Sequence, residues 1–161
     1  MALLDAKARA QLPDSAFGDI RADELLAVFK QAPSALAAAV DIQRTLLARS
    51  WLNEARVRIR LGLHTGRPTL TDTGYVGLAV HMAARVCAAA HGGQIVMSHF
   101  AREAMDAHQA AGVSFRDLGL HELRGLPEPE RLFQVEAAGL PTDFPPPARV
   151  SVASAGLRNR P

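Results

Sequence analysis

The chain has 161 residues, of which 48% are hydrophobic and 21% charged, and its formal net charge at pH 7 is only +2. This length and composition are those of one globular domain, and they exclude a disordered or fibrous protein. The apolar runs are all shorter than the roughly 20 residues that cross a bilayer, and the single cysteine, Cys87, excludes an internal disulfide. No Cys/His spacing suits zinc, and the N-terminus lacks a signal-peptide core, so the sequence predicts a cytoplasmic protein with no membrane partner.

The N-terminal third predicts a helix, a buried strand and a second helix. Residues 2–12 are rich in Ala and Leu at helical spacing, and Pro13 would end a helix there. The apolar run 25–29 is typical of a buried strand, whereas apolar side chains recur at helical spacing over residues 34–49.

Residues 56–64 alternate between apolar and polar side chains, which predicts a half-buried strand. The polar positions include three arginines: Arg56, Arg58 and Arg60. Such a stripe could meet nucleic acid, but the low net charge favours a solvent-exposed strand face.

Short elements alternate over the rest of the chain. A polar hairpin or loop at residues 68–77 is followed by a predicted helix over 79–90, a strand over 94–98, a helix over 100–108 and strands over 113–118 and 132–136. This order favours an α/β sandwich with helices packed on a sheet. Residues 141–161 contain a Pro145-Pro146-Pro147 run and predict an extended, loosely ordered linker, so we expect the domain to span residues 1–140.

Four segments, in the right order and spacing, resemble class III adenylyl and guanylyl cyclase domains of the actinobacterial type. They are residues 23–29 (DELLAVF), 61–66 (LGLHTG), 77–98 (GLAVHMAARV through HGGQIVMS), and 115–131, which resembles the terminal hairpin of the family. The resemblance implies the ferredoxin-like cyclase fold, with helices on one face of a mostly antiparallel sheet.

The resemblance also implies the site. Asp23 falls at the second metal-binding aspartate, although a turn aspartate is an equal alternative. Arg85 falls at the arginine that stabilises the transition state, and His81, one helical turn earlier, occupies the place of its asparagine partner. Arg124 is the candidate phosphate-binding residue, or else a solvated arginine beside Glu122.

Several family positions are altered. Gly74 replaces the base-reading aspartate and Asp19 the base-reading lysine, so neither ATP nor GTP is favoured. The first metal aspartate is missing, because Asp5 and Asp14 lie in the wrong context for it. We therefore expect an N-terminally truncated, degenerate domain that lacks its first strand and leaves a central sheet position open.

Two functions follow from the resemblance. The first is a phosphorus–oxygen lyase that converts ATP or GTP to a cyclic nucleotide and pyrophosphate in intracellular signalling, with Mg²⁺ or Mn²⁺, as a homodimer, and with weak or lost activity. The alternative is a non-catalytic dimerisation or nucleotide-binding regulatory module. Nucleic-acid binding ranks well behind both.

Overall fold

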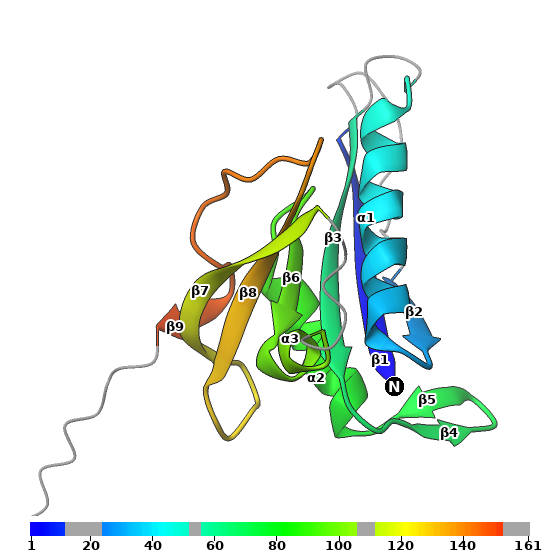
Figure 1. Cartoon of the computed structure of the whole chain (residues 1–161). Coiled ribbons are helices and arrows are strands. Elements are labelled where there is room, and N and C mark those ends of the chain that lie inside the picture. Colours follow the sequence, from blue (N-terminus) through cyan, green and yellow to red (C-terminus); the bar gives the residue numbers. More distant parts are fainter. Residues whose placement is uncertain (12–23, 52–55, 106–111, 153–161) are drawn as a thin grey trace, which may run out of the picture.

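A seven-stranded sheet forms the centre of the molecule, a computed structural model that describes residues 1–11, 24–51, 56–105 and 112–152 (Figure 1). Its order is β2-β1-β3-β6-β8-β7-β9. The strands are β1 (Ala2–Gln11), β2 (Glu24–Phe29), β3 (Arg56–Thr65), β6 (Ile95–Ser98), β7 (Val113–Leu123), β8 (Glu130–Ala137) and β9 (Val150–Val152). Neighbouring strands are antiparallel except β3 and β6, which confirms the mostly antiparallel sheet expected from the sequence.

The helices cover both faces of this sheet, not one face as expected. The described helices are α1 (Ala32–Ala48), α2 (Leu78–Ala89) and the short α3 (His99–Glu103), and a separate hairpin joins β4 (Thr69–Thr71) to β5 (Gly74–Val76). Leu61 and Leu63 of β3 pack with α1, whereas Gly62 between them faces Cys87 of α2. Because side chains alternate along a strand, α1 and α2 lie on opposite faces.

The helix predicted for residues 2–12 is wrong, because these residues form the central strand β1. The strand pairs with β2 on one side and with β3 on the other, so it fills the sheet position that we expected to be open. Leu4 packs among the side chains of α1, whereas Leu3 packs with Ala79 and Ala83 of α2. Its apolar start, Ala2–Leu4, is covered on both faces, and a short apolar run of this kind cannot be told from a buried helix by its spacing.

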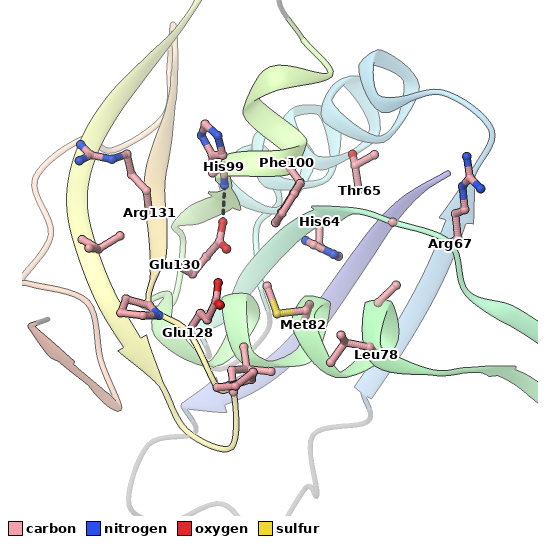
Figure 2. Close-up of a pocket in the computed structure, with 16 residues that line it drawn as sticks. His64, Thr65, Arg67, Leu78, Met82, His99, Phe100, Glu128, Glu130 and Arg131 are labelled. Carbon is pink, nitrogen blue, oxygen red and sulfur yellow. Dashed lines mark hydrogen bonds between the residues drawn. The ribbon is translucent and has the colours of Figure 1, made fainter.

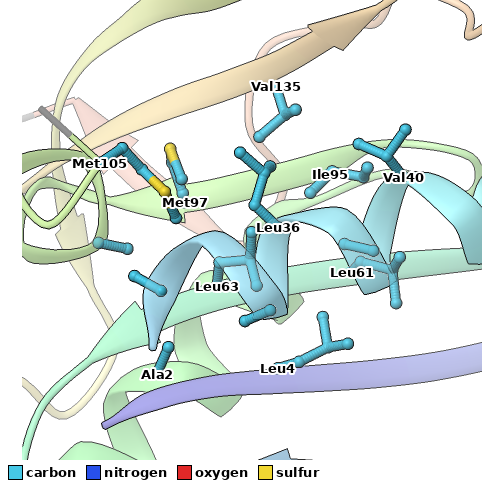
Figure 3. Close-up of a cluster of buried hydrophobic side chains, with 14 of the residues drawn as sticks. Ala2, Leu4, Leu36, Val40, Leu61, Leu63, Ile95, Met97, Met105 and Val135 are labelled. Atoms are coloured by element: carbon cyan, nitrogen blue, oxygen red, sulfur yellow. The ribbon is translucent and has the colours of Figure 1, made fainter. Parts of the chain in front are cut away.

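The main core lies between the sheet and α1 (Figure 3). Leu36 and Val40 of α1 meet Leu61 and Leu63 of β3, and all four side chains are at most 4% exposed. Residues of β1, β6 and β8 extend this cluster, which therefore joins strands from both ends of the chain. Burying such side chains contributes about 2 kcal/mol each, the main stabilising term for a domain of this size.

The opposite face is held by an unusually close contact between α2 and β3. A Cβ atom on Gly62 would lie 2.6 Å from the Cα atom of Cys87, and it would also overlap the Cys87 backbone nitrogen. Both are backbone atoms, so no side-chain rotation relieves the overlap. Glycine at position 62 lets the helix lie directly on the strand and fixes its height above the sheet.

We expect Gly62→Ala to lower the free energy of unfolding by more than about 3 kcal/mol, because α2 must move to admit the methyl group. Gly139→Ala is the matched control. It has open space but a positive φ of 83°, and should cost only about 1 kcal/mol of backbone strain. Urea denaturation measures both, and equal losses would contradict the close contact.

A buried polar link joins the end of β3 to the start of α3. The His64 Nδ1 lies 2.9 Å from the Ser98 Oγ, which also accepts a hydrogen bond from the Ala101 backbone N–H and so caps α3. His64 is 5% exposed, and burial lowers its pKa from 6.5 to about 4. The imidazole is therefore neutral at pH 7.

This low pKa predicts acid sensitivity. Between pH 6.5 and pH 4 the unfolded chain binds a proton at His64 that the folded chain does not, so His64 lowers stability as the pH falls, by about 3 kcal/mol in all. His64→Asn keeps a polar atom near Ser98 and cannot titrate. We expect it to reduce the stability difference between pH 7 and pH 4.5, measured by urea denaturation, by about 2 kcal/mol.

Residues 141–152 pack on the domain, which corrects the expectation of a loosely ordered linker for this part of the chain. The Thr142 carbonyl accepts hydrogen bonds from Arg116 and Gln134, and the Ala148 N–H donates to the Ala89 carbonyl at the end of α2. β9 then adds to the edge of the sheet by pairing with β7. Residues 153–161 lie outside the described residues, and a domain boundary at residue 140 stays a prediction.

No helix among the described residues combines the length and the apolar character that crossing a bilayer requires.

Candidate functional site

The exposed face of α2 displays the two residues that the sequence singled out on this helix. His81 and Arg85 are both exposed, whereas Ala83, Val86 and Cys87 are buried against the sheet. Residues four apart on a helix lie on the same face. The buried residues of α2 therefore fix the direction in which His81 and Arg85 project.

Arg85 reaches the turn that contains Arg124. The Arg85 Nη2 lies 4.0 Å from the position that a Cβ atom would take on Gly125. Arg124 and Gly125 belong to the turn between β7 and β8, and Gly125 has a positive φ of 80°. Two candidates that are 39 positions apart in the sequence therefore meet at one turn.

The tail brings a further arginine to this turn. A pocket of about 630 Å³ is lined by residues 122–129 together with Arg149 and Val150. Val150 begins β9 and pairs with Leu123, so the position of Arg149 follows from this pairing. Arg149 has a positive φ of 55°, a conformation that costs a non-glycine residue about 1 kcal/mol. Sequence reasoning missed Arg149, because it placed residues 141–161 outside the domain.

The three arginines have no salt bridge with any described residue, unlike Arg116 and Arg131, which pair with Glu136 and Asp117. Glu122 and Glu128 also line the pocket, so the charges of its two arginines and two carboxylates cancel. Arg85, which approaches from α2, gives the turn a net positive charge. Unpaired guanidinium groups are suited to bidentate hydrogen bonds with phosphate. The arrangement is therefore suited to a polyphosphate.

The remaining predicted positions are not brought to this turn. Asp23 and Asp19 lie outside the described residues. Gly74 begins β5, and no atom lies within 4 Å of the place of its missing Cβ. Among the described residues, no three His, Cys, Asp or Glu side chains lie close enough to hold a metal ion.

A second pocket has a different lining. It has a volume of about 710 Å³, and its lining includes neither His81 nor any of the three arginines. It lies where β3 ends, between α2 and the turn joining β7 to β8.

Comparison with known proteins gives relatives of two kinds. An uncharacterized protein of Mycobacterium tuberculosis is 40% identical over 124 residues, which are 77% of this chain and 41% of the relative. The receptor-type adenylate cyclase GRESAG 4.3 of Trypanosoma brucei brucei is 37% identical over 87 residues, or 50% of this chain and 7% of the relative. The chain therefore spans about two fifths of the length of the mycobacterial relative. No protein-family model matches the chain.

Solved structures of nucleotide cyclase domains share the fold of this chain. The guanylate cyclase domain of RhGC from Catenaria anguillulae, solved in complex with GTP, superposes with a TM-score of 0.65 at 18% identity, covering 84% of this chain and 96% of that one. The chain thus has the fold of class III adenylate and guanylate cyclase catalytic domains, and the resemblance found in its sequence is confirmed.

The role of Arg149 can be tested with inorganic triphosphate. We expect Arg149→Ala to weaken triphosphate binding by about fivefold, because one charge-assisted contact is lost, whereas Arg149→Lys should keep most of the affinity. Arg49→Ala removes the same charge from beyond the end of α1, on the opposite face, and should have no effect. Isothermal titration calorimetry gives the three affinities. Unchanged binding in Arg149→Ala would place this residue outside the site.

Proposed function

We propose that the chain is a cyclase homology domain that binds a nucleoside triphosphate through Arg85, Arg124 and Arg149, with weak or lost cyclase activity. The observation that supports this proposal most directly is the approach of Arg85 to the turn of Arg124. The cyclase fold joins an arginine of the α2 helix to a basic residue of the terminal hairpin, and both belong to the phosphate-binding surface implied by the resemblance.

In this proposal Arg124 and Arg149 hold the outer phosphates, and Arg85 stabilises negative charge at the α-phosphate. Cyclisation forms a bond from the ribose 3′-oxygen to the α-phosphorus and breaks the bond to pyrophosphate, so the charge that develops must be neutralised. His81 would assist Arg85 as a hydrogen-bond donor. An imidazole differs from an amide in reach and in charge, which favours a reduced rate.

In this proposal the domain discriminates little between the adenine and guanine bases of the nucleotide. Gly74 offers no side chain at the position of the base-reading aspartate, and the surrounding space is open. A site without a side chain that hydrogen-bonds the base discriminates little between adenine and guanine. We therefore expect ATP and GTP to bind with similar affinity.

The described residues do not by themselves supply a set of three or more ligands for Mg²⁺ or Mn²⁺. Asp23 remains the proposed metal ligand. Asp5 lies on the central strand β1 and not on a helix, and it is 7% exposed and pairs with Gly62 of β3. A buried carboxylate on that strand makes Asp5→Asn a useful companion to Asp23→Asn when metal-dependent binding is measured.

Nucleotide cyclases of this class work as dimers, and we extend the proposal to a homodimer. The exposed face of α2, with His81 and Arg85, would face the partner subunit. The alternative function, a dimerisation module that binds no nucleotide, predicts self-association without any affinity for triphosphates.

Binding and turnover separate these functions. With Mn²⁺ present, we expect micromolar to millimolar binding of both ATP and GTP but little cyclic nucleotide, and about tenfold weaker binding in Arg85→Ala than in the Arg49→Ala control. His81→Asn should raise any residual turnover, because the amide replaces the imidazole. Calorimetry measures binding and chromatography measures product.

Two results would count against this function. Robust Arg85-dependent turnover by the natural chain would show an active enzyme. A dimer that binds neither nucleotide, seen by analytical ultracentrifugation together with calorimetry, would favour the dimerisation module.

A further inference from the structure

The pocket of about 710 Å³ has a largely apolar wall with carboxylates on one side (Figure 2). Leu78 and Met82 of α2 form one wall, and Phe100 at the start of α3 faces them together with His64. Leu78 is 66% exposed and Phe100 is 51% exposed, although each adjoins this pocket. A pocket of this volume is of the size that encloses small organic ligands.

The charge that faces the interior is negative. The carboxylates of Glu128 and Glu130 face the pocket from the side of the turn between β7 and β8, whereas Arg131 points away from it (Figure 2). Arg131 is paired with Asp117 at 2.6 Å, and Arg67 lies at the far rim.

The two histidines of the pocket do not offset these carboxylates. The Nε2 atom of His99 lies 3.1 Å from a carboxylate oxygen of Glu103, one helical turn along α3. The low pKa of His64 keeps that ring neutral at pH 7. No unpaired positive charge of the lining therefore faces the carboxylates: Arg131 and His99 are paired with other carboxylates, Arg67 lies at the rim, and His64 is neutral.

The Glu130 carboxylate uses only one of its two oxygens in a hydrogen bond to the described residues. It is 7% exposed, and its Oε1 accepts a hydrogen bond of 2.7 Å from the His99 backbone N–H. Its other oxygen, Oε2, has no hydrogen-bond partner among the described residues and is not fully buried, so it is open to the pocket. Burial raises the pKa of this carboxyl, which reflects the cost of holding its charge away from water. A largely desolvated carboxylate with one oxygen open to a pocket is stabilised by a cation or a strong donor there.

From this arrangement we propose that the pocket binds a small amphipathic organic cation, with its ammonium group at Glu130 and Glu128 and its apolar body against Met82, Leu78 and Phe100. An aromatic face at Phe100 also suits a cationic ligand. The site goes beyond the proposed nucleotide function, because its lining includes none of the three arginines.

The test compares two probes that share a skeleton and differ in charge. We expect 4-phenylbutylamine to bind at least about tenfold more tightly than 4-phenylbutan-1-ol, because only the amine forms an ion pair with Glu130. Glu130→Gln keeps an oxygen for the His99 N–H and should remove this preference. Glu122→Gln is the matched control on the neighbouring strand β7, outside this lining, and should retain the preference.

A second variant keeps the test decisive if Glu130→Gln does not fold. Met82→Trp fills the cavity and should abolish binding of both probes while leaving the oligomeric state unchanged. Two-dimensional NMR of the full chain measures binding, and analytical ultracentrifugation measures mass.

Equal binding of amine and alcohol, or no binding of either, would overturn the proposal. So would a dimer that Met82→Trp dissociates, since the occupant would then be a second copy of the chain. None of these results depends on triphosphate binding.

Discussion

The contact between α2 and β3 at Gly62 is the constraint on which both candidate sites depend. Because backbone lies against backbone there, α2 cannot shift without breaking the contact, and its buried stripe sets the rotation of the helix. That rotation directs Arg85 toward the turn at Gly125 and places Met82 in the wall of the larger pocket. One helix thus positions a cationic surface and an acidic, apolar cavity.

Much of this arrangement could be predicted from the sequence where patterns are local. The alternation over 56–64 predicted β3, and the apolar spacing over 79–90 predicted α2. β1 could not be predicted in this way. Its Ala/Leu run satisfies helical and strand spacing equally, and only pairing with β2 and β3, which are distant in sequence, decides between them.

Two of the three arginines of the phosphate site could be predicted from the sequence, and the third could not. Arg85 and Arg124 were found because they lie within segments that resemble the cyclase family, and the structure brings their neighbourhoods together. Arg149 lies in a Pro-rich segment with no hydrophobic period. Its place is set by single contacts, such as the Ala148 N–H on the Ala89 carbonyl and the pairing of Val150 with Leu123. Contacts of this kind leave no pattern in a sequence.

The two pockets share one wall, residues 126–129 of the turn between β7 and β8. Glu128 belongs to both linings, so its charge acts on a cation on one side and on a phosphate on the other. A cation that neutralises Glu128 removes a repulsion from the phosphate side, and thermodynamic linkage makes this effect reciprocal. Electrostatics alone therefore favours positive coupling between a bound amine and a bound triphosphate, without any movement of α2, which the contact at Gly62 holds in place.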